Sequence, residues 1–286
     1  MIEPAQSDGE LLADVARNCG RDDESFRVWW LGQSGFLVQY RGAHLLFDPY
    51  LSESLTRKYA TTDKPHVRMT RRAVDPTSLT FVDAVTSTHN HTDHLDAETL
   101  NPILVAGHAK LVVAAANATF AAERLKRDSG EFLVLDVGER GTIGPFEIEP
   151  VPAAHEDLDR DDAGRHLYVG FVVRFGPHVV YHAGDTVRYP GMAERLRPFG
   201  IELAFLPING RGPERRVSGN LWGREAAALA KDAGIGRAIP CHYEMFEFNT
   251  ASPAEFVAEC ERLGQECTVL RCGERYDSSV LREEEP

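Results

Sequence analysis

Short apolar runs recur along the chain and predict strands, starting with a group that has no helical pattern in between. The first three runs are Phe26–Leu31, Phe36–Tyr40 and His44–Phe47, and an Arg41-Gly42 turn joins the last two. Later runs of the same kind predict further strands at Ala84–Ser87, Leu111–Ala114, Phe146–Val151, Tyr168–Phe175, His178–Tyr181, Leu203–Pro207, Arg237–Pro240 and Thr268–Arg271.

Helical patterns fall between some of these runs, at Asp8–Asn18, Asn117–Arg127 and Leu221–Ala233. The last of these carries an Ala/Leu face and ends at Gly234, which is a typical C-cap residue. The tetrapeptide Ser252-Pro253-Ala254-Glu255 has the pattern of a capping box with proline at the first helical position. It predicts the start of a helix that stops near Gly264.

The order of elements favours an α/β fold in which two sheets pack together and helices cover them, a four-layer αββα sandwich. Strands come first, strands mixed with helices follow, and the end of the chain is βαβα-like. A doubly wound sheet is disfavoured by the early hairpins, and neither glycine-rich nucleotide motif is present. We expect an N-terminal helical extension (residues 1–25), a single domain (26–280) and an acidic tail (281–286).

Composition and charge narrow the function. The chain has 286 residues, 43% of them hydrophobic and 26% charged, which suits a globular protein with a substantial core. A net charge of −13 argues against a general nucleic-acid binder, because such binding depends on neutralising phosphates. The five cysteines form no Cys-x-x-Cys pair, and neither a signal peptide nor a membrane span is apparent. We therefore expect a cytoplasmic protein that does not act on membranes.

The densest chemical motif is Thr88-His89-Asn90-His91-Thr92-Asp93-His94, directly after the strand predicted at Ala84–Ser87. A loop at the end of a rigid strand holds polar groups in fixed directions. Imidazoles and a carboxylate, without a thiolate, suit Zn²⁺, Mn²⁺ or Fe²⁺. Four ligands are too many for one catalytic ion that must keep a position open for water, so the motif points to two ions.

Further donors follow other predicted strands. His155 comes after the strand-like Glu149–Ala154, Asp185 after His178–Tyr181, and His242 after Arg237–Pro240. Side chains placed just past strand ends would form a rim of metal ligands at one edge of a sheet sandwich.

The set of motifs resembles that of the metallo-β-lactamase fold superfamily, and the resemblance runs from about Val28 to Tyr276. The motifs that match are the His-x-His-x-Asp-His loop, His155, Gly184-Asp185 and His242. Within it the chain most resembles the L-ascorbate 6-phosphate lactonase-like hydrolases. N-acyl-phosphatidylethanolamine phospholipase D is a more distant likeness. The segments that carry the closer resemblance are Trp30-Leu31-Gly32, Phe47-Asp48-Pro49, Thr88 to His94 and Tyr181-His182-Ala183-Gly184-Asp185-Thr186.

The resemblance implies a role for each matching residue. His89, His91 and His155 would hold one divalent ion, Asp93, His94 and His242 would hold the other, and Asp185 would bridge the two. The nucleophile would be a hydroxide between the ions, with Zn²⁺ or Mn²⁺ expected ahead of Fe²⁺. Asp93 and Asp185 would thus serve catalysis as well as metal binding.

Several neighbouring residues have less specific predicted roles. Asp48 is expected behind the ligands, orienting a histidine or the loop. His182, two residues before Gly184-Asp185, is a candidate for substrate binding or for protonating the leaving group, with a packed strand histidine as the alternative. Cys241 is expected to point away from the metals. His66 and four other histidines belong to no motif.

Two basic clusters are candidates for binding an anionic substrate. One comprises Arg57, Lys58, Lys64, Arg68, Arg71 and Arg72, and the other comprises Arg211, Arg215 and Arg216, after a turn that contains Asn209. The planar guanidinium group of arginine can bind a phosphate or a carboxylate through two parallel hydrogen bonds. Within these clusters and the turn, the favoured substrate contacts are Arg68, Arg71, Arg72, Asn209 and Arg211.

The leading interpretation is a dinuclear metal-dependent hydrolase that opens a lactone, ester or similar bond in a small, phosphorylated metabolite. The main alternative is a metal-dependent phosphodiesterase of the phospholipase D or nuclease kind. A di-iron redox enzyme is disfavoured because Asn90 and Thr92, not a glutamate, stand in the variable positions of the loop. A non-enzymatic scaffold is disfavoured because no expected ligand is missing. The expected partner is a small anionic metabolite, and a homo-oligomer is compatible with the sequence.

Overall fold

The first of two β-sheets contains the early hairpins and continues into parallel strands. Its strand order is β14-β1-β2-β3-β4-β5-β6, with antiparallel pairing from β14 to β3 and parallel pairing from β3 to β6. The computed structural model describes residues 1–20, 24–212 and 218–279. The strands of this sheet are β1 (Phe26–Gly32), β2 (Gly35–Tyr40), β3 (Ala43–Phe47), β4 (Ala84–Ser87), β5 (Lys110–Ala114), β6 (Leu133–Leu135) and β14 (Arg275–Asp277).

The second sheet has the strand order β13-β12-β11-β10-β9-β8-β7. Pairing is antiparallel from β7 to β10 and parallel from β10 to β13. As a result β8, β10, β11 and β12 run in the same direction. Its strands are β7 (Gly141–Ile143), β8 (Phe146–Pro152), β9 (Val169–Phe175), β10 (His178–His182), β11 (Leu203–Pro207), β12 (Arg237–Cys241) and β13 (Glu266–Cys267).

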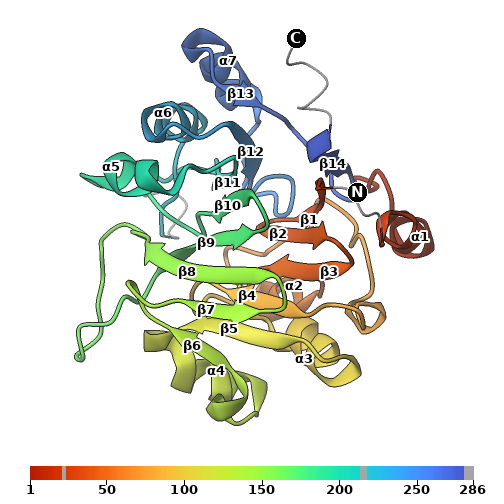
Figure 1. Ribbon diagram of the computed structural model, residues 1–286. Coiled ribbons are helices and arrows are strands. Elements are labelled where there is room, and N and C mark those ends of the chain that lie inside the picture. Colours follow the sequence, from red (N-terminus) through yellow and green to blue (C-terminus); the bar gives the residue numbers. More distant parts are fainter. Residues whose placement is uncertain (21–23, 213–217, 280–286) are drawn as a thin grey trace.

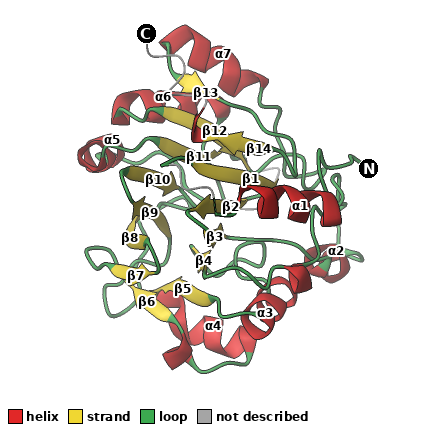
Figure 2. Ribbon diagram, turned by 45° about the vertical axis from the view of Figure 1, so that its right-hand side comes forward, coloured by secondary structure: helices red, strands yellow, loops and turns green. Residues whose placement is uncertain are grey.

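Helices cover the outer faces of both sheets, which confirms the αββα sandwich predicted from the sequence (Figures 1 and 2). Beside the first sheet lie α1 (Asp8–Asn18), α2 (Ser54–Tyr59), α3 (Ala97–Ala106) and α4 (Ala118–Leu125). Beside the second lie α5 (Met192–Leu196), α6 (Gly223–Ala233) and α7 (Ala254–Leu263). None of the helices in the described part of the chain has the length and apolar character that a membrane crossing requires.

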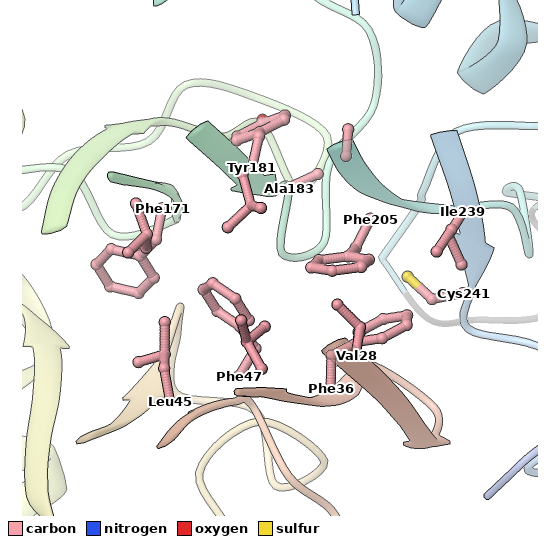
Figure 3. Close-up of a cluster of buried hydrophobic side chains, with 14 of the residues drawn as sticks. Val28, Phe36, Leu45, Phe47, Phe171, Tyr181, Ala183, Phe205, Ile239 and Cys241 are labelled. Atoms are coloured by element: carbon pink, nitrogen blue, oxygen red, sulfur yellow. The ribbon is translucent and has the colours of Figure 1, made fainter. Parts of the chain in front are cut away.

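Aromatic side chains fill the space between the two sheets, as Figure 3 shows for Phe36 and Phe47 on one side and Phe171 and Phe205 on the other. The rings of Phe36 and Phe205 stack with centroids 4.0 Å apart. Stacked, fully buried rings of this size dominate the energy of a core. The layer between the sheets therefore holds the two strand systems in one fixed relation.

The N-terminal helix packs into the same core and does not stand apart from it. Leu11 and Val15 of α1 are buried in the main hydrophobic cluster. Asp14 accepts hydrogen bonds from Trp29 Nε1 at 3.0 Å and from Arg275 at 2.8 Å. The segment taken as an extension is thus part of the sandwich, and the predicted acidic tail (281–286) lies outside the described residues.

Two local predictions near the C-terminus are wrong. Thr268–Arg271 is not a strand, because the chain leaves the second sheet after Cys267 and crosses to pair with β1 as β14. The capping box does not form: Ser252 Oγ accepts from the Ala254 N–H at 3.2 Å, while the Glu255 carboxylate accepts from Arg224 on α6. That ion pair links α6 to α7.

We predict that Phe36→Ala lowers the free energy of unfolding by about 3–5 kcal/mol. The substitution removes a ring that stacks on Phe205 and leaves a cavity in the core that neighbouring side chains fill only in part. Urea unfolding measures the change. Phe120→Ala is the matched control, since that ring is 39% exposed. A loss below about 1 kcal/mol for Phe36→Ala, or equal losses in both variants, would show that the inter-sheet stack does not govern stability.

Candidate metal centre

Four loops that follow strands meet at one edge of the sandwich. The loop after β4 carries His89, His91, Asp93 and His94, and the loops after β8, β10 and β12 carry His155, Asp185 and His242. Because β8, β10 and β12 run in the same direction, their carboxyl ends lie at the same edge of the second sheet. The parallel run of strands thus brings together residues far apart in the sequence.

A first group of donors consists of His89, His91 and His155, whose ligand atoms all lie within 4.8 Å of one another. His155 Nδ1 donates to the Gly219 carbonyl at 2.9 Å. This hydrogen bond fixes the tautomer and leaves His155 Nε2 facing His91 Nδ1 at 3.2 Å. When neither of these two nitrogens carries a proton, their lone pairs are available to a shared cation.

A second group consists of Asp93, His94 and His242, whose ligand atoms also lie within 4.8 Å of one another. The Asp93 Oδ2 atom is 3.7 Å from His94 Nε2 and 3.5 Å from His242 Nε2. Both histidines present the same ring nitrogen to the centre of the group.

The Asp185 carboxylate lies between the two groups. Its Oδ1 is 3.3 Å from His94 Nε2, and its Oδ2 is 3.3 Å from His242 Nε2 and 3.6 Å from His155 Nε2. Metal bonds of about 2.0–2.2 Å set neighbouring tetrahedral ligands about 3.3–3.6 Å apart. The observed separations therefore match the edges of metal coordination shells.

Three of the donor atoms are buried without a hydrogen-bond partner in the described part of the chain, as expected of metal ligands. His89 Nε2, His94 Nε2 and Asp185 Oδ1 are buried and have no hydrogen-bond partner among the described residues. An unpaired polar atom away from water is costly, and a cation removes that cost. The residues present thus fit two divalent ions in number, chemistry and spacing.

Opposite charges accumulate in the metal-free cluster. Burial opposes ionisation of Asp185, but His242 and His94 outweigh it and hold the pKa of the carboxyl well below its usual range. Burial also opposes protonation of His242, but Asp185 and Asp93 outweigh it and raise the pKa of its imidazole to about 9. The acidic and basic groups stabilise one another, and a divalent cation would replace the imidazole protons.

The Asp48 carboxylate lies directly behind the metal loop and is fully buried. It accepts hydrogen bonds from His94 Nδ1 at 2.8 Å, from Thr86 Oγ1 at 2.7 Å, and from both the N–H and the hydroxyl of Thr88. The contact with Nδ1 directs His94 Nε2 toward Asp93 and Asp185. Asp48 therefore contacts a candidate ligand histidine, and its predicted role in orienting that ligand stays a prediction.

Gly184, next to Asp185, is required by close backbone packing. Its φ angle is +61°, and a Cβ atom would come within 2.8 Å of the Val169 carbonyl and 2.9 Å of Thr88 Cβ. Only glycine allows the loop after β10 to pass this close to the metal loop.

His182 and Cys241 do not face the centre. His182 Nε2 donates to the Ser34 carbonyl at 2.8 Å, and its Nδ1 accepts from the Gly184 N–H. Its ring stacks on Phe47 with centroids 4.9 Å apart, in the layer between the sheets. The structure thus places His182 as a packed strand histidine and not as a proton donor. Cys241 lies in the same layer (Figure 3).

A cavity of about 360 Å³ opens onto the two donor groups. The described residues that line its far side form an apolar wall of Leu55, Tyr59, Phe246 and Phe248, with His66 among them. The His66 ring stacks on Tyr59 at 4.3 Å and meets the edge of Phe248 at 4.5 Å. Asn90, Asn220 and Asn249 add amide groups to the lining.

The arginines predicted to bind substrate lie elsewhere. Arg68 is buried, where Nε contacts Glu53 at 2.7 Å and Nη2 donates to the Ser52 carbonyl at 2.6 Å. Arg71 pairs with Glu3 at 3.4 Å, and Arg72 pairs with Asp75 at 2.9 Å. None of the three is among the described residues that line the cavity.

The described residues of the second predicted group, Arg211 and Asn209, are not among those that line the cavity. Arg211 forms a two-pronged ion pair with Glu225 at 2.6 and 2.8 Å. Asn209 Nδ2 donates to Asn249 and its Oδ1 accepts from Asn220, so it positions two lining residues from behind. Arg215 and Arg216 lie outside the described residues.

Among the described residues, the lysine and arginine side chains that line the cavity are Lys58 and Arg124, neither of which was favoured as a substrate contact. Lys58 Nζ lies 5.0 Å from the centroid of the Tyr59 ring. Arg124 Nη1 donates to the carbonyls of Asn90 at 2.7 Å and Leu95 at 3.2 Å, which braces the metal loop. Lys58 belongs to the first basic cluster, so the segment was identified but the wrong members were chosen. His66 was missed because it belongs to no motif.

Comparisons with known proteins identify the family of the chain. The model of the beta-lactamase superfamily domain matches residues 44–243. A UPF0173 metal-dependent hydrolase from Opitutus terrae is 32% identical over 259 residues, which covers 88% of this chain and 99% of that protein. The chain belongs to the metallo-β-lactamase superfamily and, within it, to the UPF0173 metal-dependent hydrolase family.

Solved structures share the fold. Isothiocyanate hydrolase from Delia radicum gut bacteria superposes with a TM-score of 0.68 at 20% identity, covering 87% of this chain and 98% of that chain. A metallo hydrolase from Ignicoccus hospitalis superposes with a TM-score of 0.63 at 22% identity, covering 88% and 98%. At these identities the likeness concerns architecture alone.

We predict that Asp48→Asn weakens binding of the ion at His94 by about 10–100-fold, because the carboxylate that orients the ring is lost. Metal titration of the purified variant measures this. Asp83→Asn is the matched control: that carboxylate also accepts from an imidazole, His108 Nε2 at 2.8 Å, but outside the centre. Equal affinity in wild type and Asp48→Asn would contradict the orienting role.

Proposed function

We propose that the chain is a dinuclear metal-dependent hydrolase that opens a lactone, ester or similar bond in a small anionic metabolite. The observation that carries the proposal is the position of Asp185, whose carboxylate contacts histidines of both donor groups, His94 and His242 of one and His155 of the other. One carboxylate shared by two donor groups is the arrangement that a pair of ions needs. Zn²⁺ and Mn²⁺ suit the imidazole and carboxylate donors, and Fe²⁺ is a third candidate.

Two ions at this centre would lower the pKa of water and polarise the scissile carbonyl. The chain's own residues then have distinct tasks. His89, His91 and His155 would hold one ion, Asp93, His94 and His242 would hold the other, and Asp185 would be shared between them. Asp48 keeps His94 in place, and the Gly219 carbonyl does the same for His155.

The cavity supports a small substrate with both an apolar part and an anionic part. Its volume of about 360 Å³ is at the lower end of small-molecule sites. The wall of Leu55, Tyr59, Phe246 and Phe248 would exclude water from an apolar portion. The Lys58 ammonium, beside the Tyr59 ring, would bind a phosphate or carboxylate.

His66 is the better candidate for proton transfer than His182. Its Nδ1 lies 3.3 Å from the Lys64 carbonyl, a contact that favours the tautomer with a lone pair on Nε2. Because the ring lines the cavity, a leaving group there could exchange a proton with Nε2. Its three aromatic neighbours, Tyr59, Phe246 and Phe248, hold the ring in one orientation.

A phosphodiesterase remains the second candidate, because the same metal centre could activate water toward phosphorus. Among the described residues the cations that line the cavity are Lys58 and Arg124, beside an extensive apolar wall. This lining favours a small ester or lactone over a nucleic-acid backbone, which needs several cations along its path.

We predict that Asp185→Ala abolishes hydrolysis while the fold persists, because the shared carboxylate is lost but the strands around it are not. Nitrophenyl butyrate, γ-butyrolactone and bis(nitrophenyl) phosphate are the probes, and thermal unfolding reports on the fold. Asp83→Ala serves as the control variant.

We also predict that chelation abolishes wild-type activity and that added Zn²⁺ or Mn²⁺ restores it. Full activity after chelation would exclude a metal-dependent reaction.

We predict that Lys58→Ala raises KM for a carboxylated nitrophenyl ester by about tenfold, equal to about 1.4 kcal/mol, because one charge-assisted contact is lost. KM for a neutral ester with the same leaving group should change little. Arg71→Ala, in the same segment but outside the cavity, is the matched control. Equal loss on both esters, or a larger effect of Arg71→Ala, would contradict an anion-binding role of Lys58.

A further inference from the structure

A glutamine that belongs to no recognised motif lies against the metal centre. Gln33, in the turn between β1 and β2, is fully buried. Its Nε2 is 2.8 Å from Asp93 Oδ2 and 3.1 Å from His242 Nε2. Both of these atoms are proposed ligands of the same ion, so the carboxamide touches the coordination shell itself.

The backbone holds Gln33 firmly in this position. Its φ angle is +50°, in the left-handed region that a side chain of this size adopts only when the surroundings enforce it. Its carbonyl accepts from Trp30 Nε1 at 3.0 Å and from the His242 N–H at 3.0 Å. The second bond ties Gln33 directly to a proposed ligand, so the carboxamide and the His242 ring keep a constant relation.

The other end of the carboxamide is unsatisfied. Gln33 Oε1 is buried and has no hydrogen-bond partner among the described residues. The amide N–H of Gln33 can donate to Asp93. An ion bound by Asp93 and His242 would use the lone pairs of these two side chains, which would then no longer accept a hydrogen bond from the amide. A half-turn about the last side-chain torsion exchanges the amide nitrogen and oxygen, and places an acceptor oxygen there instead.

The distances suit such an exchange. In a shell of five or six ligands with bonds of about 2.1 Å, neighbouring ligand atoms lie about 3.0 Å apart. The carboxamide atom beside Asp93 and His242 stands 2.8 and 3.1 Å from them. It therefore occupies the position of an additional ligand next to the two.

We propose that Gln33 is a further ligand of the metal centre, contributing Oε1 to the ion held by Asp93, His94 and His242. This inference rests on the proposed dinuclear centre. With Asp185 the ion then has five protein ligands, and a water molecule brings the number to six. Gln33 is thereby a determinant of which metal this position prefers.

The extra oxygen ligand favours Mn²⁺ or Fe²⁺ over Zn²⁺ at this position. Zn²⁺ prefers four ligands in a tetrahedron, whereas Mn²⁺ accepts six and favours oxygen donors. The other ion, held by His89, His91 and His155, gains no such ligand and should keep a stronger preference for Zn²⁺.

The test is metal titration of the purified, metal-free chain, without substrate. Mn²⁺ and Zn²⁺ are compared by competition, and Co²⁺ reports coordination number through the intensity of its visible absorption. Gln33→Ala removes both ends of the carboxamide. Gln33→Glu keeps an oxygen ligand but cannot donate a hydrogen bond to Asp93. Gln39→Ala is the matched control. Gln39 on β2 is also buried, and its Oε1 has no hydrogen-bond partner within the described part of the chain, but its Nε2 contacts His44 and the Val15 carbonyl away from the centre.

We expect Gln33→Ala to weaken Mn²⁺ binding at one of the two positions by about 10–100-fold, with a smaller change for Zn²⁺ and a stronger Co²⁺ absorption. Gln33→Glu should retain Mn²⁺ binding, and Gln39→Ala should match wild type. Loss of Mn²⁺ binding in Gln33→Glu as severe as in Gln33→Ala would mean that the side chain acts only as a donor to Asp93, and overturns the proposal. Unchanged titrations in both Gln33 variants overturn it as well.

These outcomes are separable from failure of the proposed function. If wild type binds two ions per chain and the Gln33 variants match it, only the role of Gln33 is wrong. If wild type binds no second ion, the dinuclear centre itself is wrong. Thermal unfolding of each metal-free variant shows whether the fold is intact.

Discussion

The Asp48 carboxylate is the contact on which the geometry of the metal centre depends. A fully buried carboxylate is tolerated only when donors surround it, and Thr86, Thr88 and His94 supply them. Asp48 follows β3, whereas Thr86 lies in β4 and Thr88 directly follows that strand. The hydrogen bonds that compensate the burial of Asp48 therefore also join two strands and orient a proposed ligand, His94. The start of the loop at Thr88 and its last histidine, His94, are thus both held by Asp48, while Arg124 braces the loop between them through the Asn90 carbonyl. The candidate metal centre therefore continues directly from the pairing of β3 with β4.

The proposed ligands could be predicted from the sequence because their chemistry and their place after strands agree. His155, Asp185 and His242 each follow a strand that is apolar enough to recognise, and parallel strands end at a common edge. The substrate contacts could not be predicted in the same way. Arg68 and Lys58 look alike in the sequence, but Arg68 is buried against Glu53 and Ser52 whereas Lys58 faces the cavity. Long cationic side chains find partners through tertiary packing, which neither spacing nor composition reveals.

The strands of the two sheets were mostly predictable, and the failures share a cause. Strand β14 pairs with β1, which comes from the opposite end of the chain. No local pattern therefore distinguishes β14 from Thr268–Arg271, which was predicted to be a strand and is not one. Helix α3 was not predicted because Pro102 interrupts its pattern, although Asp96 caps its first turn by accepting from the Thr99 N–H. Gln33 was overlooked for the same kind of reason: its significance lies in contacts with Asp93 and His242, which are 60 and 209 positions away in the chain. Local sequence predicts elements and their chemistry, whereas distant pairing decides which polar side chains meet.

The two sides of the cavity belong to different packing units, and this division has a functional consequence. The metal side is built from strand ends that share the main core. The apolar wall rests on a separate small cluster of Tyr50, Leu55, Met245 and Phe246, with Tyr59 and Phe248 packed against it. Arg68 holds this cluster together, since its guanidinium lies 5.4 Å from the centroid of the Tyr50 ring and its Nη1 donates to Met245 Sδ. The arginine expected to bind an anion therefore supports the wall instead. Because the wall packs apart from the sandwich, substitutions in it can change the shape of the cavity without disturbing the strand ends that carry the proposed ligands. In the proposed function the chemistry of the reaction and the choice of substrate would therefore be set by separate parts of the molecule, the strand ends and the apolar wall.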